Sequence, residues 1–216
     1  MAGEAQAEPG AGAADPEHQV SVQRVAHAEL PLHIDELARL RIEVFREFPY
    51  LYEGSLDDER RYQQSFAASA RSTLVLARVG SRVVGAATAM PLVEHDDATQ
   101  LSPALARAGY APEQVYYFGE SVLELAQRGR GIGHAFFDQR EQRARELGFL
   151  VAAFCAVERT RTHPARPSDY VPHDAFWTRR GFARRAELTA RFSWRDVGDA
   201  EETDKEMVFW LKELRP

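Results

Sequence analysis

Residues 115–133 read VYYFGESVLELAQRGRGIG, and this stretch decides the fold. Its first part, Val115–Leu123, is rich in β-branched and aromatic residues, which predicts a β-strand. A tight glycine turn with two arginines follows, and residues 134–147 then show a helical pattern that ends at Gly148. At such a junction the N–H groups of a helix N-terminus converge, and glycines let a ligand approach the main chain. The stretch therefore predicts a phosphate-binding turn between a strand and a helix.

The spacing within this turn excludes two common phosphate motifs. It lacks the Gly-Lys-Ser/Thr ending of a P-loop. A dinucleotide fingerprint needs a further glycine and an acidic residue at the end of the next strand, yet residues 149–157 contain no acidic residue. The turn does match an Arg/Gln-x-x-Gly-x-Gly pattern through Arg128, Gly131 and Gly133. Taken alone, an ordinary strand-to-helix turn is the competing interpretation.

Composition narrows the class of protein. The chain has 216 residues, of which 44% are apolar and 28% charged, as expected of one globular domain. A net charge of −6 argues against nucleic-acid binding. The single Cys155 excludes an internal disulfide, and the histidines show no metal-ligand spacing, so no metal is expected. No apolar run is long enough to cross a membrane and no signal peptide is evident, so a cytoplasmic protein without membrane contacts is predicted.

The order of predicted elements describes a mixed α/β protein. Residues 1–18 have almost nothing to bury and are predicted to form a disordered tail. Apart from the central unit, strands are expected at 20–26, 73–79, 82–90, 149–157, 182–194 and 206–211, and helices at 31–48, 56–69 and 172–180. Residues 95–112 are interpreted as a helical insert. The order is β-α-α-β-β-(insert)-β-α-β-α-β-β.

This order, together with the glycine turn, resembles the GNAT (Gcn5-related) N-acetyltransferases. The resemblance extends from Val20 to the C-terminus, which implies a single domain over residues 19–216. The segments FPYLY (48–52), GESVL (119–123) and HDAFW (173–177) also resemble a bacterial subgroup of these proteins. The family fold implied is a mixed, mostly antiparallel sheet of six to seven strands, with a splayed parallel pair and flanking helices.

The resemblance implies a cofactor and the residues that hold it. GNAT enzymes bind acetyl-CoA in the gap between the splayed strands, with the pyrophosphate on the glycine turn. Here the backbone of Val122, Leu123 and Leu125 would meet the pantetheine arm, and the Leu123 N–H would polarise the thioester carbonyl. The turn would supply the N–H groups of the diphosphate cradle, the apolar contact of Ile132 and the arginine charges: Arg128, Gly129, Arg130, Gly131, Ile132, Gly133 and His134.

Direct transfer to an amine requires a base and an acid. Glu120 is the candidate base because an acidic residue in mid-strand interrupts an apolar run, although a solvated strand face would explain it equally simply. Glu124 is the second candidate. Many family members carry, where this chain has Trp177, a tyrosine that acts as the general acid. An indole cannot protonate a thiolate. Tyr170 or solvent is therefore the predicted acid.

The acceptor is predicted from two groups of residues. Tyr50, Tyr52 and Glu53 lie where this fold builds one wall of the acceptor pocket, and they suit an amine. Arg159 and Arg161 follow the second splayed strand and would suit an anionic group on the acceptor, or else form a solvated loop. The expected acceptor is a small-molecule amine. The alternatives are a peptide amine and a catalytically silent CoA-binding module, and a homodimer through the C-terminal strands or the insert is possible in either case.

Overall fold

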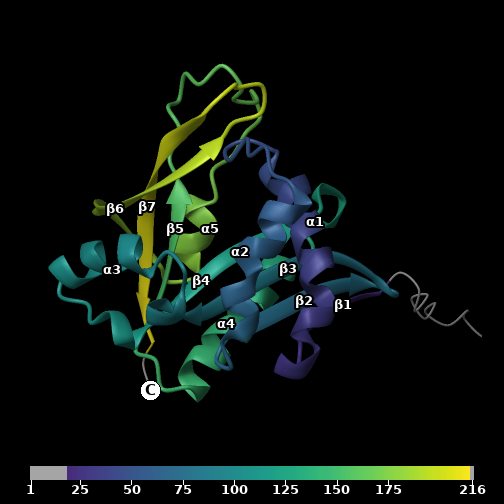
Figure 1. The fold of residues 1–216 in the computed structure, drawn as a ribbon, viewed down its shortest axis with the longest axis vertical. Coiled ribbons are helices and arrows are strands. Elements are labelled where there is room, and N and C mark those ends of the chain that lie inside the picture. The colour runs from purple at the N-terminus through teal and green to yellow at the C-terminus, as the bar shows by residue number, and fades with distance from the viewer. Residues whose placement is uncertain (1–18, 215–216) are drawn as a thin grey trace, which may run out of the picture.

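A seven-stranded sheet forms the centre of the computed structural model, which describes residues 19–214 (Figure 1). Its strand order is β1-β2-β3-β4-β5-β7-β6, and every neighbouring pair is antiparallel except β4 and β5. The strands are β1 (Val20–Arg24), β2 (Thr73–Val79), β3 (Arg82–Pro91), β4 (Val115–Leu123), β5 (Val151–Val157), β6 (Ala183–Arg195) and β7 (Glu202–Glu213). This sheet confirms the predicted fold class. The predicted tail at 1–18 lies outside the described residues.

Helices cover both faces of the sheet. They are α1 (Ile34–Phe45), α2 (Leu56–Ala68), α3 (Ala98–Arg107), α4 (Ile132–Glu146) and α5 (Asp174–Arg179), with short 3₁₀ turns η2 (His27–His33), η3 (Leu92–Glu94), η4 (Pro112–Gln114) and η5 (Leu125–Gln127). The first predicted helix, 31–48, is shorter in the structure because Pro31 lies within the preceding 3₁₀ turn and the α-helical backbone ends at Phe45. The apolar residues of α1 pack on one face of β2, β3 and β4, and those of α4 pack on the opposite face.

The parallel pair of strands separates soon after it forms. Val115–Tyr117 of β4 pair with Val151–Ala153 of β5, and no further pairs join the two strands. Beyond this point β4 continues along β3, while β5 continues along β7 (Figure 1). One edge of β4 is therefore free of a neighbouring strand over its last residues, which is the splay predicted from the sequence.

A β-bulge in β4 determines which side chains face each side of the sheet. Ala87 and Ala89 of β3 pair with Ser121 and Phe118, so the two residues between them oppose the single Thr88. An extra residue reverses the alternation of side chains beyond it. Tyr117 and Glu120 consequently line a cavity on the α1–α2 side of the sheet. Without the bulge, Glu120 would point to the side of Phe118 and α4.

Candidate active site

The glycine turn exposes a row of unpaired backbone N–H groups at the start of α4. Gly131 occupies the N-cap position with φ 82°, and Gly129 has φ 76°, a backbone region that favours glycine. Within the described residues, the N–H groups of 129–131 donate no hydrogen bond, and the first-turn N–H groups of 132–134 have no partner in the helix. The helix dipole adds positive potential at the same point. The turn therefore presents the features expected of a phosphate cradle.

The two arginines of the turn have different surroundings. Arg128 donates to the Leu123 carbonyl at 3.2 Å and to the Glu47 carboxylate at 2.8 Å, so its guanidinium lies against the free edge of β4. Arg130 donates to Gln127 at 2.5 Å and is exposed. Among the residues that the structure describes, Arg130 pairs with no carboxylate and could contact a bound anion directly, whereas Arg128 would first have to release Glu47.

The last residue of β4 directs its backbone into the gap between the splayed strands. The Glu124 N–H donates to Val84 of β3 at 3.0 Å, so the Leu123 N–H, one residue earlier, points away from β3 and toward the gap. The Leu123 carbonyl points the same way, because it accepts from Arg128. These two groups fit the predicted contacts with a pantetheine amide and a thioester carbonyl.

Two other predicted backbone contacts are not brought to the gap. Val122 pairs with Ala86, and alternation turns its N–H and carbonyl toward β3, so the prediction that Val122 offers its backbone to the cofactor is wrong. Leu125 lies in the 3₁₀ turn η5, where its carbonyl accepts from the Arg128 N–H and its side chain is exposed. Its carbonyl is thus already paired in this structure.

A cavity of about 330 Å³ occupies the gap between β4 and β5. Leu123 contributes from β4, Ala156 and Val157 from β5, and His173 and Trp177 from the region of α5. Its position beside the glycine turn and along the free edge of β4 makes it the cofactor-side cavity. Space, a free strand edge and a phosphate cradle together fit a molecule with the shape of CoA.

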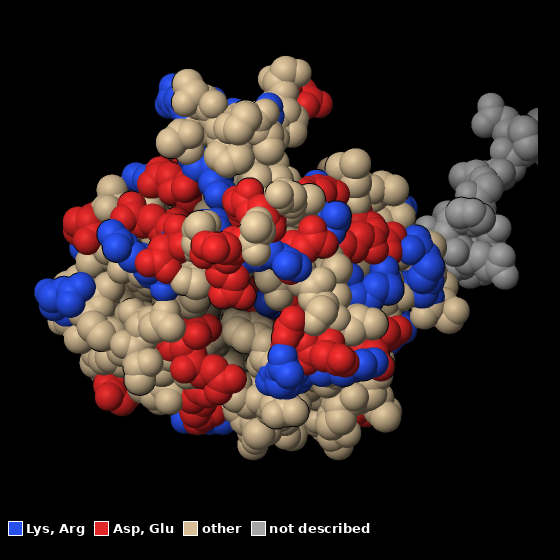
Figure 2. All heavy atoms as spheres, turned by 45° about the horizontal axis from the view of Figure 1, so that its top comes forward, with Lys and Arg blue, Asp and Glu red and all other residues tan. Residues whose placement is uncertain are grey.

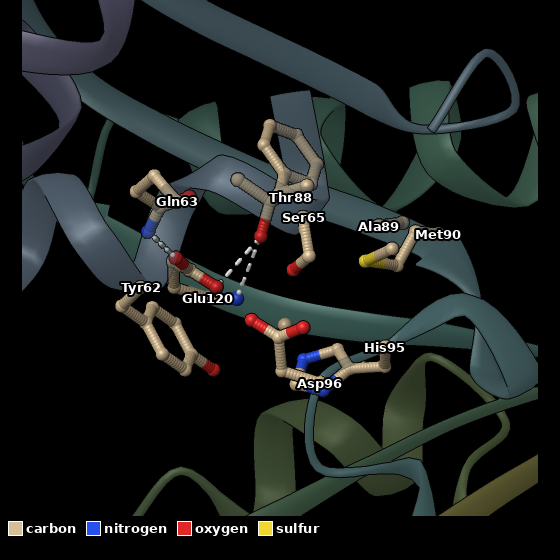
Figure 3. Close-up of a pocket in the computed structure, with 11 residues that line it drawn as sticks. Tyr62, Gln63, Ser65, Thr88, Ala89, Met90, His95, Asp96 and Glu120 are labelled. Carbon is tan, nitrogen blue, oxygen red and sulfur yellow. Dashed lines mark hydrogen bonds between the residues drawn. The ribbon is translucent and has the colours of Figure 1, made fainter. Parts of the chain in front are cut away.

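Glu120 is a buried carboxylate with several fixed partners (Figure 3). Gln63 of α2 donates to it at 2.9 Å and Thr88 of β3 donates at 2.7 Å. The Arg41 guanidinium of α1 lies 2.6 Å from the same carboxylate and also pairs with the buried Glu59. Burial raises the pKa of Glu120, but Arg41 and the donated hydrogen bonds more than offset it, so the pKa lies below its usual value. The carboxylate is therefore ionised at neutral pH.

The bulge that presents Glu120 is held from both faces of the sheet. On one face, the Thr88 hydroxyl accepts from the Glu120 N–H at 3.0 Å. On the other, the Arg140 guanidinium of α4 donates to the carbonyls of Thr88 and Glu120 at 3.2 and 3.1 Å and to the Ser121 hydroxyl at 2.8 Å. Arg140 is fully buried and forms no salt bridge within residues 19–214. Desolvation lowers the pKa of Arg140 to about 9.

A second cavity, of about 420 Å³, lies on the other side of Tyr50 from the cofactor-side cavity. Phe45 and Tyr50 line both cavities, so the two meet at these rings. Glu120 lies at the inner end of this acceptor-side cavity, and aromatic rings form much of its wall: Phe45, Tyr50, Tyr52, Tyr62, Tyr117, Phe192 and Trp194. Tyr50, Tyr52 and Glu53 are thus brought together as predicted from the sequence.

The arginines predicted to contact the acceptor lie elsewhere. Arg159 donates to the carbonyls of Pro49 and Tyr50 at 2.9 Å and pairs with Asp196 at 2.8 Å, so it ties two loops together. Both Arg159 and Arg161 line the cofactor-side cavity. Neither lines the acceptor-side cavity, so their prediction as acceptor contacts needs correction.

Tyr170 and Trp177 both line the cofactor-side cavity. Tyr170 packs edge-on against Phe48 with 4.7 Å between ring centroids, and Arg166 lies 4.7 Å over its ring. Trp177 packs against Phe154 and Trp210, which explains an indole at this position by core packing. Glu124, the second candidate base, pairs with Arg82 at 2.7 Å and lines neither large cavity.

Several residues of the site could not be found from the sequence. Arg41 and Gln63 lie on helical faces whose pattern does not mark them as partners of Glu120. Arg140 lies within a charged run of α4 and is the one member of that run whose guanidinium is fully buried. Only the contacts between distant segments identify these residues, and a single sequence contains no record of such contacts.

The splayed parallel pair, the glycine turn with its exposed N–H groups and the two adjoining cavities are together typical of a transferase that uses an acyl-CoA. The acetyltransferase (GNAT) family model matches residues 37–184, and the chain belongs to this family. The family assignment made from the strand, turn and helix order is thus confirmed. No curated protein matches the sequence.

Solved structures share the fold at low sequence identity. The ribosomal-protein-alanine N-acetyltransferase of Brucella melitensis has a TM-score of 0.57 at 15% identity, covering 90% of this chain and 99% of that one. The polyamine N-acetyltransferase of Drosophila melanogaster has a TM-score of 0.56 at 14% identity, with coverage of 91% and 100%. The PaiA N-acetyltransferase of Thermoplasma acidophilum, solved in complex with coenzyme A, has 0.52 at 10% identity, with coverage of 90% and 99%.

Two further findings concern the described residues alone. Between residues 19 and 214 no cluster of three or more His, Cys, Asp or Glu side chains is arranged to hold a metal ion. In the same part of the chain, every helix is too short or too polar to pass through a bilayer.

Proposed function

We propose that this protein transfers the acetyl group of acetyl-CoA to the amino group of a small molecule. The observation that carries this proposal is the junction of the two cavities. Tyr50 and Phe45 separate a space beside the phosphate cradle from a space with an ionised carboxylate at its inner end. A donor on one side and an amine on the other would meet beside the Leu123 N–H.

The residues present fit the cofactor. Residues 129–134 would hold the diphosphate through their free N–H groups, and Leu123 would pair with the pantetheine arm. When bound, acetyl-CoA supplies an activated acetyl thioester. The Leu123 N–H would stabilise the negative charge that develops on the acetyl oxygen, in the manner of an oxyanion hole.

Glu120 would attract the acceptor amine and hold the water molecule that takes its proton. Because the pKa of Glu120 is lowered, the carboxylate is a weak base and stays charged throughout the neutral range. Its role is therefore to hold an ammonium group or a water molecule at the cavity end and to favour loss of a proton to that water. Thr88 and Gln63 fix the carboxylate, which gives this role a defined geometry.

A tyrosine would return a proton to the leaving thiolate, and Tyr170 and Tyr50 are the two candidates. Tyr170 lines only the cofactor-side cavity, whereas Tyr50 lies where the two cavities meet. Burial raises the pKa of both phenols, so each would be protonated at neutral pH. Comparison of Tyr170→Phe with Tyr50→Phe in single-turnover experiments distinguishes them, because only loss of the acid slows release of the thiol.

The decisive experiment is turnover by Glu120→Gln. The amide keeps the shape of the carboxylate but removes its charge, so we expect turnover to fall by about 10²–10⁴-fold. CoA affinity, measured by calorimetry, should stay within about threefold because Glu120 faces the other cavity. Glu124→Gln is the matched control and should retain activity. Unchanged turnover in Glu120→Gln would refute this role.

A second candidate function is a CoA-binding module without catalysis. The observation in its favour is the close pairing of Glu120 with Arg41, which reduces the basicity of the candidate base. Such a module would bind CoA but release no thiol with any amine. Thiol release with a panel of amines therefore separates the two functions.

A further inference from the structure

The acceptor-side cavity contains a carboxyl group, that of Asp97, which forms no salt bridge with a lysine or arginine among residues 19–214. Asp97 lines this cavity at the N-cap position of α3, but its side chain makes no capping hydrogen bond. The one basic group within salt-bridge distance among residues 19–214 is the His95 ring, whose Nδ1 lies 3.7 Å away, while the Arg41 guanidinium acts on Asp97 from farther off. That same Nδ1 accepts the Asp97 backbone N–H at 3.1 Å, so it is occupied in the neutral ring.

The Asp97 carboxylate contrasts with Glu120, which Arg41 already neutralises in part. Only 21% of the Asp97 side chain is exposed, and burial raises its pKa, an effect that His95 and Arg41 offset only in part. Burial lowers the pKa of His95, which keeps the ring uncharged at neutral pH. The cavity thus presents two separate carboxyl groups, one at Glu120 and one at Asp97.

The wall between these two positions suits the hydrocarbon part and the charge of an alkyl amine. Tyr62 and Tyr117 line the cavity together with His95, whose ring centroid lies 6.2 and 5.1 Å from theirs. Aromatic faces bind both methylene groups and ammonium groups. At about 420 Å³ the cavity is far larger than one ammonium group requires.

Other charges at the cavity also favour a cation. Six carboxylates line it: Glu53, Asp58, Glu59, Asp97, Glu120 and Glu202. Three of these, Glu53, Asp58 and Glu59, already pair with Arg46, Arg61 and Arg41. Two guanidiniums also line the cavity, of which Arg41 is paired inside and Arg195 lies at the exposed rim. Figure 2 shows Asp and Glu side chains, interspersed with Lys and Arg, across the middle of the face that includes the top of Figure 1.

We infer that the acceptor is a diamine, with one amino group at Glu120 and a second, cationic group at Asp97. This inference rests on the proposed function, because it names the substrate class of the same site. The Asp97 contact adds binding energy that a monoamine of the same length cannot obtain. A carboxylate at that end would be repelled.

The test compares 1,4-diaminobutane and longer α,ω-diamines with monoamines and ω-amino acids of matched length. With wild-type protein and acetyl-CoA, we expect kcat/KM for the best diamine to exceed that of its matched monoamine by about tenfold or more. Asp97→Asn should remove this advantage through KM and leave the monoamine unchanged. Asp199→Asn is the matched control, since Asp199 is exposed and does not line the acceptor-side cavity.

The outcomes of this test separate the diamine inference from the proposed function. Equal kcat/KM for diamines and monoamines, or an equal effect of Asp97→Asn on both, would overturn the diamine inference and leave amine acetylation standing. Preference for an ω-amino acid would overturn it too and would point to Arg195. Binding of CoA without turnover of any amine would refute the proposed function itself. A calorimetric titration of CoA-bound Asp97→Asn with the diamine checks that the loss is in binding.

Discussion

Gly119 shows how a single absent side chain helps to determine which face of the sheet receives Glu120. A Cβ atom at this position would lie 2.7 Å from the Thr88 hydroxyl, which is the group that holds the Glu120 N–H and carboxylate. We therefore expect Gly119→Ala to displace Thr88, to lower the free energy of unfolding by about 1–3 kcal/mol, and to reduce turnover at least about tenfold. Denaturant unfolding and thiol-release assays measure the two effects.

The control for Gly119 is Gly109→Ala. Gly109 has φ 86°, so alanine is strained there too, but no atom lies within 4 Å of the added Cβ. This variant should lose stability without losing turnover per folded molecule. If both variants reduced turnover equally, the role of the bulge in placing Glu120 would have to be abandoned.

Arg140 is the second residue whose effect reaches the site through the backbone. Lysine has one ammonium group and cannot bridge the Thr88 and Glu120 carbonyls and the Ser121 hydroxyl at once. We expect Arg140→Lys to cost about 1–3 kcal/mol of stability, because buried acceptors lose a donor, and to lower kcat more than it raises the KM for acetyl-CoA. Arg143→Lys, one turn away in an exposed pair with Glu146, should change neither.

The pKa of Glu120 predicts a particular dependence of rate on pH. A group whose pKa is lowered below its usual value is already ionised at pH 6, so its titration cannot limit the rate above that pH. The rise of kcat/KM with pH should then follow deprotonation of the acceptor amine. Glu120→Gln should lower the whole profile without moving its acidic limb, and a limb that disappeared in this variant would contradict the lowered pKa.

At the scale of elements, β4, the glycine turn and α4 follow from local pattern. Apolar alternation, glycines at 129 and 131 and a helical run are all short-range signals, so the sequence predicts this strand, turn and helix correctly. That the turn binds phosphate stays a prediction. The bulge is different, because the extra residue is accommodated by Thr88, 32 positions away. The face on which Glu120 lies is thus a long-range property, and the sequence pattern alone could not determine it.

The contacts of Arg159 are likewise long-range and do not follow from its local sequence. Arginines after β5 suggest an anion site, but in the structure Arg159 connects the α1–α2 loop, through Pro49 and Tyr50, to Asp196 after β6. We expect Arg159→Ala to lower stability by about 1–3 kcal/mol, since Asp196 keeps Lys205 as a partner. Because Tyr50 would lose its support, the KM for the acceptor should rise. A change in CoA affinity alone, measured by calorimetry, would contradict this.

At the scale of the whole molecule, the two cavities come from segments that no local pattern connects. The cofactor-side cavity combines the ends of β4 and β5 with α5, and the acceptor-side cavity combines α1, α2 and the β6–β7 hairpin (Figure 1). The order of the elements fixes the fold, and it therefore predicts that cavities exist in these two places. The charges that face each space depend on side-chain directions, which the order of elements does not determine: Glu53 lines the acceptor-side cavity, whereas Arg159 and Arg161 line the cofactor-side cavity.

Binding of CoA should be visible as stabilisation of the whole domain. A ligand that binds only the folded state at 100 times its Kd adds about 2.7 kcal/mol, which for a domain of this size raises Tm by roughly 5–10 °C. The double variant Arg130→Glu/Gly131→Glu places two negative charges in the cradle and should abolish the shift, whereas Arg107→Glu on the exposed end of α3 should retain it. NAD should give no shift with any of the three proteins. If acetyl-CoA and CoA both left Tm unchanged in the wild type, the glycine turn would hold no cofactor and the proposed function would fall with it.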